Sequence, residues 1–234
     1  MTAAGVLDLG EEGAAFARGG NRLCFVDPRH PERCIKVLRA DRSPAQKRRE
    51  ATPIKRLKPL SRFDDNQQEA AVYRRIEGRI GSAAFELVPR LHGFVATSLG
   101  PGLCSELLRD DDGRIAITLK QYLWQHGESA SLAPLLEHFC ARWRALGMPS
   151  RHLLLHNIVL QYRGGQPAAL KVIDGLGWPD LLPLAWYLPP LARRKAGQRA
   201  RRLHSAILSL LDKRASGGDF GIHGWLDDTR RHEG

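Results

Sequence analysis

Residues 33–38 read Arg-Cys-Ile-Lys-Val-Leu, a short apolar run that carries one lysine. An earlier apolar run follows the pair Gly19-Gly20, and a proline-rich turn separates the two runs. Two such runs are typical of a small antiparallel sheet. Because side chains alternate along a strand, Lys36 shares a face with Cys34 and Leu38, and we expect it to have an anionic partner there.

A helix is predicted from Asp65 to about Ile80. Asp65 and Gln68 have the spacing of a capping box. One helical face then carries an acid among apolar residues, at positions Glu69, Tyr73, Ile76 and Ile80. A carboxylate on a buried face is costly unless it is paired, so Glu69 needs a cation.

The segment between strand and helix, Arg39 to Arg62, carries nine bases against Asp41 and Glu50, with three prolines. We expect a mobile basic loop. A solvated linker and a ligand-facing patch both remain open, because charge runs are commonly just solvated.

The remaining pattern predicts a second hairpin, a turn and then a mainly helical half. The hairpin is formed by Val88–Ser98 and Leu103–Leu108, and the turn by Asp110–Gly113. The second half has a helix with an apolar stripe from Leu132 to Leu146. It also has a hairpin of residues 158–162 and 168–173, a basic amphipathic helix over Leu191–Leu211, and a loose tail after Ser216.

Composition bounds the function. The chain has 234 residues, enough for one large domain or two joined lobes. Thirty-six Lys and Arg against 25 Asp and Glu give +11, a charge that attracts phosphate, anionic lipid or nucleic acid.

The four cysteines lie far apart without a Cys-x-x-Cys pair and are interpreted as core residues. Neither a secretory signal nor a membrane span is predicted, so we expect a cytoplasmic protein, with peripheral contact at the inner membrane surface as an alternative.

The order of these features is the order found in protein-kinase-like folds: a glycine turn, a strand lysine, a helix glutamate, Arg-x₅-Asn and a downstream Asp-Gly. A phosphoryl-transfer site needs a cation on the phosphates, an anion that orients this cation, and oxygen ligands for Mg²⁺. Lys36, Glu69, Asn157 and Asp174 are the residue types required.

From about Phe16 to Gly177 the sequence resembles the YrbL family of PhoP-regulatory-network proteins, bacterial members of the kinase-like superfamily. The resemblance rests on residues 33–38, on Gly-Leu-Cys-Ser-Glu-Leu-Leu-Arg-Asp-Asp-Asp-Gly at 102–113, on His-Asn-Ile-Val-Leu at 156–160 and on Val-Ile-Asp-Gly-Leu-Gly at 172–177. It implies an α+β, bilobal protein-kinase-like fold with a β-rich lobe at 1–108 and an α-rich lobe at 109–234.

The resemblance also implies ATP and Mg²⁺ as cofactors, bound between the lobes, and a role for each matching residue. Gly19 and Gly20 fall in the phosphate-covering turn. Lys36 is similar to the lysine that contacts the phosphates, and Glu69 to its helix partner. The segment from Glu106 to Leu108 resembles the hinge that meets the adenine, and Asn157 and Asp174 resemble the metal ligands.

The departures from the kinase-like pattern leave the activity open. Arg151-His152 stands where an aspartate follows the arginine, so the usual catalytic carboxylate is missing. Either His152 substitutes as a base, or the protein binds nucleotide without transfer as a regulatory pseudokinase, or it binds no nucleotide. The glycine turn is shorter than G-x-G-x-x-G, and Gly175 replaces the aromatic residue of Asp-Phe-Gly.

Structural roles also remain open for the same residues. Lys36 and Glu69 could form a purely structural ion pair, Asn157 could tie its loop to the hairpin, and Asp174 could form a turn before Gly175. A zinc pair of His152 and His156 is disfavoured, because no Glu lies between them.

Three classes of partner fit the basic segments 39–62 and 193–202: an acidic protein, nucleic acid, and anionic lipid or phosphorylated envelope glycolipid. Nucleic acid is the less favoured, because aromatic residues make up only 7% of the chain and no known nucleic-acid motif is present. The alternative to a nucleotide-binding protein is therefore a basic-surface protein without nucleotide chemistry.

Overall fold

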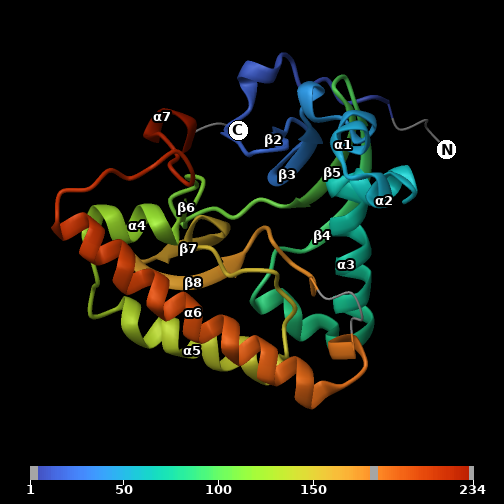
Figure 1. Ribbon diagram of the computed structural model, residues 1–234. Helices are drawn as coiled ribbons and strands as arrows, with labels where there is room; N and C mark the ends of the chain where they lie inside the picture. Colours follow the sequence, from blue (N-terminus) through green and yellow to red (C-terminus); the bar gives the residue numbers. More distant parts are fainter. Residues whose placement is uncertain (1–4, 180–183, 232–234) are drawn as a thin grey trace. The chain divides into compact units, whose positions relative to one another are not determined.

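The computed structural model describes residues 5–179 and 184–231 (Figure 1). Its contacts divide the chain into two compact units. The described part of the first unit comprises residues 5–73 and 90–107. The second comprises residues 74–89, 108–179 and 184–231. Strands and helices occur in both units, which confirms the α+β class. The predicted kinase-like lobes at 1–108 and 109–234 stay a prediction.

The first unit is built on an antiparallel sheet with the strand order β1-β2-β3-β5-β4. Both predicted hairpins are confirmed, because β2 pairs with β3 and β4 pairs with β5. A short 3₁₀ turn, η1 (Glu12–Ala14), precedes the sheet. The strands are β1 (Ala17–Arg18), β2 (Arg22–Asp27), β3 (His30–Leu38), β4 (Leu91–Thr97) and β5 (Gly100–Glu106).

Alternation along β2 and β3 separates an apolar face from a face with polar groups. Leu23 and Phe25 pair in register with Val37 and Ile35, and all four are buried in one cluster. A fully buried side chain of this size contributes about 1.5–3 kcal/mol, so this face holds the sheet together. The opposite face presents Lys36 directly across from Cys24.

The expected loop at 39–62 is wrong in its secondary structure, because the segment forms short helices. Ser43 Oγ accepts a hydrogen bond from Gln46 N (3.3 Å), and Pro44 occupies the first turn, where a missing N–H costs nothing. Thr52 and Pro53 begin the next helix in the same way, without the side-chain bond. The elements are η2 (Ala40–Arg42), α1 (Pro44–Glu50), α2 (Pro53–Arg56) and η3 (Leu60–Phe63).

The predicted helix is confirmed as α3 (Asp65–Ile80), but its cap is one residue earlier than expected. Asp64 Oδ1 accepts hydrogen bonds from Asn66 N (2.9 Å) and Gln67 N (3.0 Å). Asp65 instead pairs with Lys47 Nζ of α1 at 2.6 Å. The division between the units falls within α3, after Tyr73.

The second unit combines a small sheet with helices. The predicted hairpin is confirmed as β7 and β8, and the sequence did not predict the two-residue strand β6 that pairs with β7. The strands are β6 (Ile117–Thr118), β7 (Ile158–Arg163) and β8 (Gln166–Val172). The helical elements are η4 (Gly81–Glu86), α4 (Leu119–His126), α5 (Leu132–Leu146), η5 (Leu155–Asn157), η6 (Leu184–Trp186), α6 (Pro189–Ala215) and α7 (Asp228–Arg231).

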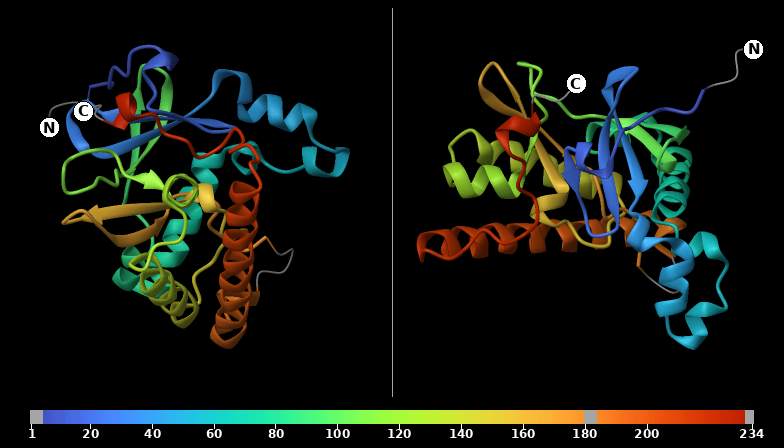
Figure 2. Two further views of the ribbon diagram at one scale, coloured as in Figure 1. Left: turned by 90° about the vertical axis from the view of Figure 1, so that its left-hand side faces the viewer. Right: turned by 90° about the horizontal axis from the view of Figure 1, so that it is seen from above.

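Helices α5 and α6 lie side by side in Figures 1 and 2. The C-terminal end of α5 fixes this packing, because Gly147 has φ 61° and a Cβ there would lie 2.9 Å from Ala192 Cβ of α6. The predicted apolar stripe of α6 is confirmed, with Leu203, Ile207 and Leu210 buried. No helix in the described part of the chain combines the length and apolar character that a membrane crossing needs.

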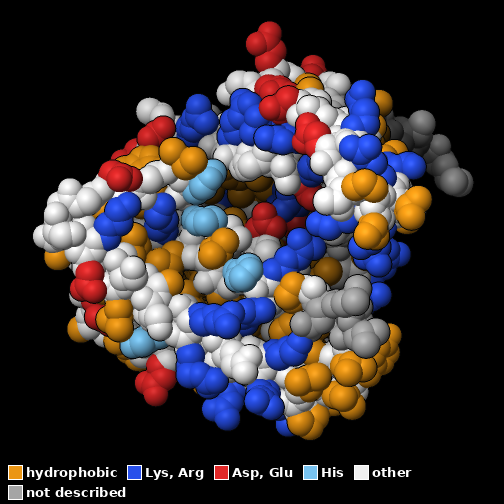
Figure 3. All heavy atoms as spheres, viewed as in Figure 1, with side chains coloured by type: hydrophobic (Ala, Val, Ile, Leu, Met, Phe, Trp, Pro, Cys, Tyr) orange, Lys and Arg blue, Asp and Glu red, His pale blue; other side chains and the backbone are white. Residues whose placement is uncertain are grey.

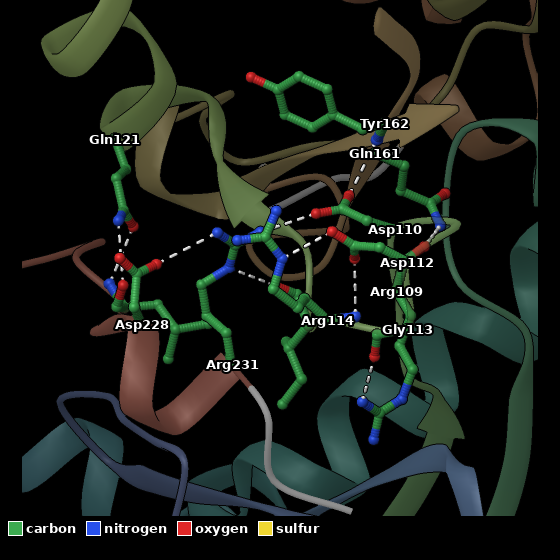
Figure 4. Close-up of polar contacts among 12 residues, drawn as sticks. Arg109, Asp110, Asp112, Gly113, Arg114, Gln121, Gln161, Tyr162, Asp228 and Arg231 are labelled. Carbon is green, nitrogen blue, oxygen red and sulfur yellow. Dashed lines mark hydrogen bonds and ion pairs between the residues drawn. The ribbon is translucent and has the colours of Figure 1, made fainter. Parts of the chain in front are cut away.

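The tail after Ser216, expected to be loose, is bonded to the second unit (Figure 4). The Gln121 side chain donates to Leu226 O (3.0 Å) and accepts from Leu226 N (2.9 Å). Arg231 Nη2 pairs with Asp110 Oδ2 at 2.7 Å, and both side chains are buried. Burial raises the pKa of Asp110, while Tyr162 N–H and Arg231 act in the opposite direction. These bonds join residues more than 100 positions apart, so no local pattern predicts them.

We expect Arg231→Met to lower the free energy of unfolding by about 3 kcal/mol, because it leaves the buried Asp110 carboxylate without its cation. Urea denaturation measures the change. The matched control is Asp228→Ala, which removes a contact to the same arginine from a side chain that is 82% exposed, and should cost less than about 1 kcal/mol. Equal losses in the two variants would contradict a structural role for the buried pair.

Candidate functional site

The lysine of β3 and the glutamate of α3 form a buried ion pair. Lys36 Nζ lies 2.7 Å from Glu69 Oε1, and the two side chains are 9% and 8% exposed. The strand places Lys36 on its polar face, and the second turn of α3 turns Glu69 toward it. The anionic partner expected for Lys36 is therefore Glu69.

Two further residues belong to this cluster and were missed in the sequence. Arg22 of β2 donates through Nη1 to the second oxygen of Glu69 and lies 3.5 Å from Asn66 Oδ1. Asn66 Nδ2 donates to the backbone oxygen of Lys36 (2.9 Å). The signals were present, because Arg22 alternates with Cys24 onto the face of Lys36, and Asn66 precedes Glu69 by three positions on one helix face.

Cys34 lies on the same face of β3 as Lys36. Hydrogen bonding with Cys24, followed by burial, raises the pKa of the Cys34 thiol well above its usual value. A thiol that keeps its proton is a poor nucleophile. Cys34 is therefore a packing neighbour of the cluster.

The glycine turn between β1 and β2 is closed by an arginine. Gly19 N donates to Arg22 O (2.8 Å), and Arg39 Nη1 donates to the carbonyl oxygens of Gly19 (3.3 Å) and Gly20 (3.2 Å). Arg39 is held in turn by Asp41 at 2.6 Å. The predicted phosphate-covering turn thus carries a fixed guanidinium on its carbonyl side.

The predicted hinge residues have local partners in their own units. Glu106, the last residue of β5, accepts from Arg90 N through Oε2 (3.0 Å), and Leu107 N donates to Glu32 O (2.8 Å). Leu108 is buried beside Ala116 in the second unit. One division between the units falls between Leu107 and Leu108, and the hinge role of Glu106 to Leu108 stays a prediction.

In the second unit, the loop after Ser150 and the end of β8 come together. Arg151 N donates to Gly175 O (2.8 Å), and Ile173 N donates to Asn157 O (2.9 Å). Gly175 has φ 76°, and a Cβ on it would lie 3.3 Å from both Asn157 Nδ2 and His152 O. A side chain at 175 would therefore be strained and crowded, which explains the glycine at this position.

Asp174 is exposed, and its Oδ1 accepts from Gly175 N at 2.6 Å. Burial lowers the pKa of the neighbouring His156. The charges of His223 and Lys120 lower this pKa further, whereas Asp174 raises it. Residues 5–179 and 184–231 contain no group of three or more His, Cys, Asp or Glu that could hold a metal. An amide oxygen with one carboxylate is nevertheless a donor set that fits Mg²⁺, which commonly takes its other ligands from phosphate and water.

We expect Glu69→Gln to destabilise the protein by about 3–5 kcal/mol, because it removes the carboxylate that Lys36 and Arg22 share in a buried place. Lys36→Ala should cost at least about 1 kcal/mol less, since Glu69 keeps Arg22 as a partner. Urea denaturation of the two variants gives the comparison. A larger loss in Lys36→Ala would show that Arg22 does not support Glu69.

Comparison with known proteins identifies the family of this chain. A profile of the family described as PhoP regulatory network protein YrbL matches residues 7–207. The YrbL proteins of Escherichia coli (strain K12) and of Shigella flexneri are each 26% identical to it over 179 residues, which cover 74% of this chain and 75% of theirs. The match includes the Lys36–Glu69 cluster and the segment from Ser150 to Gly175, and the chain belongs to the YrbL family.

Proposed function

We propose that this protein binds ATP with Mg²⁺. The observation that carries the proposal is the buried ion pair of Lys36 and Glu69. A lysine that is oriented by a carboxylate and fixed on a strand can contact nucleotide phosphates with little loss of side-chain entropy on binding. Arg22 supports the proposal by holding the other oxygen of Glu69, which fixes the carboxylate.

Asn157 and Asp174 are the residues that would hold Mg²⁺. When bound, the ion would neutralise charge on the phosphate oxygens. The protein's own contribution is positional. Gly175 bonds through its backbone to Arg151 and to the carboxylate of Asp174, and the amide of Asn157 lies near the same turn, 3.3 Å from where a Cβ on Gly175 would be.

Whether phosphate is also transferred depends on His152. Its neighbour Arg151 is tied by its backbone to Gly175, and His152 is exposed beside the same turn. A neutral imidazole can accept a proton from an acceptor hydroxyl. In the regulatory version of the proposal, the same residues bind nucleotide without transfer.

Isothermal titration calorimetry with ATP tests the proposal. We expect binding that depends on Mg²⁺, a loss of affinity of about 10- to 100-fold in Lys36→Ala, and loss of the Mg²⁺ dependence in Asp174→Ala. Lys58→Ala and Asp219→Ala are the controls, because they remove the same charges from exposed positions.

Two results would count against nucleotide binding. One is a folded natural protein, verified by circular dichroism, that takes up no ATP with Mg²⁺ present. The other is equal affinity in Lys36→Ala and Lys58→Ala, which would make the buried pair purely structural.

His152→Ala separates binding from transfer. We expect its ATP affinity to stay within about twofold of that of the natural protein, because the imidazole of His152 is proposed to act on the hydroxyl group that accepts the phosphate and not to bind ATP. Any turnover of ATP should fall by about 10²-fold or more, the usual worth of a general base. Absence of turnover in the natural protein would favour the regulatory version, and loss of ATP binding in His152→Ala would contradict the assignment.

A further inference from the structure

The segment 39–62 carries large aliphatic side chains on its surface. Ile54 is 81% exposed and Leu57 is 87% exposed, and Leu60 is exposed as well. Helices α1 and α2 bury none of their residues. In both views of Figure 2 this segment extends away from β2 and β3 of its own unit. Exposed aliphatic clusters of this kind mark interaction sites.

The same segment is strongly basic, with nine Lys and Arg against Asp41 and Glu50. Some of the bases have structural roles, such as Lys47 with Asp65. Arg49, Lys55 and Lys58 are exposed. Figure 3 shows hydrophobic side chains beside those of Lys and Arg at the right of the face, where Figure 1 has α1 and α2.

Hydrogen bonds to the backbone fix how these side chains are presented. Arg48 Nε donates to Arg56 O (3.0 Å), and Arg56 Nε donates to Ala51 O (2.8 Å). These bonds hold α2 against the end of α1. Ile54 and Leu57 are three positions apart and so share one side of the α2 turn, with Lys55 and Lys58 next to them in sequence.

We infer that the segment 39–62 docks on an anionic lipid surface. Aliphatic side chains next to lysines suit the boundary between headgroups and acyl chains of a lipid layer. There the aliphatic side chains lose contact with water, and the lysines meet the phosphate groups. Sites for single-stranded nucleic acid stack bases on aromatic side chains, and residues 39–62 contain no Phe, Tyr or Trp. Contacts to duplex phosphates would use the lysines and leave the exposed aliphatic side chains without a role. Helix α6 is the weaker candidate, because its apolar stripe is buried within its own unit.

Flotation of the full chain with vesicles tests the inference. We expect binding to vesicles of phosphatidylethanolamine and phosphatidylglycerol, none to vesicles of phosphatidylcholine, and weakening with added salt. The double variants Ile54→Ser/Leu57→Ser and Lys55→Ala/Lys58→Ala should each lower the bound fraction by about tenfold or more. All four side chains are exposed, so these variants should fold like the natural protein.

Matched controls lie on other surfaces. Ile222→Ser removes an isoleucine of similar exposure, and Arg201→Ala/Arg202→Ala removes two exposed charges from α6; both should bind vesicles like the natural protein. If Arg201→Ala/Arg202→Ala lowered the vesicle-bound fraction as much as Lys55→Ala/Lys58→Ala does, the inference would be overturned, because binding would then follow the net positive charge and not this segment. Failure of the natural protein to float, or tight binding to DNA that needs the lysines but not Ile54 and Leu57, would overturn it as well.

Discussion

The carboxylate of Glu69 is the constraint on which the first unit depends. Arg22 and Lys36 both bind it, and Asn66 binds the backbone oxygen of Lys36, so β2, β3 and the start of α3 are joined by buried polar bonds. Buried charges tolerate few arrangements, because each must keep its partner. A slip of one residue in β3 would carry Lys36 to the apolar face, so the ion pair also specifies the register of the sheet. Stability and the proposed phosphate contact therefore rely on the same geometry.

Periodicity was enough to predict the hairpins, α3, α5 and α6, because each buries one face of a regular element. It was not enough where the stabilising contact is distant in sequence, as between Gln121 and Leu226, or where an element has two residues, as in β6. The short helices at 39–62 were hidden by the charge of their residues, although Ser43-Pro44 is a helix start. For the site, residue types predicted Lys36 with Glu69, while Arg22 required the strand register and Asn66 required the face of α3.

Many arginine side chains of this basic chain donate hydrogen bonds to backbone carbonyl groups. Arg39 holds the glycine turn, and four others each close a loop or a helix end: Arg79 on Ala185, Arg109 on Gly113, Arg193 on Ala145 and Arg214 on Trp124. A guanidinium satisfies carbonyls that a helix end or turn leaves without a donor. Net charge alone therefore overstates how much of the surface is available to an anionic partner, and the position of each base matters more than the sum.

The tail adds a consequence for where this chain can be shortened. The match to the family profile ends at residue 207, yet the second unit continues through α6 to Arg231. If everything after α6 were removed, the amide of Gln121 and the carboxylate of Asp110 would lose their hydrogen-bonding partners, although both groups are buried. The end of family similarity is thus no folding boundary. The last sixteen described residues cover α4 and β6 and supply hydrogen-bond partners there in place of water.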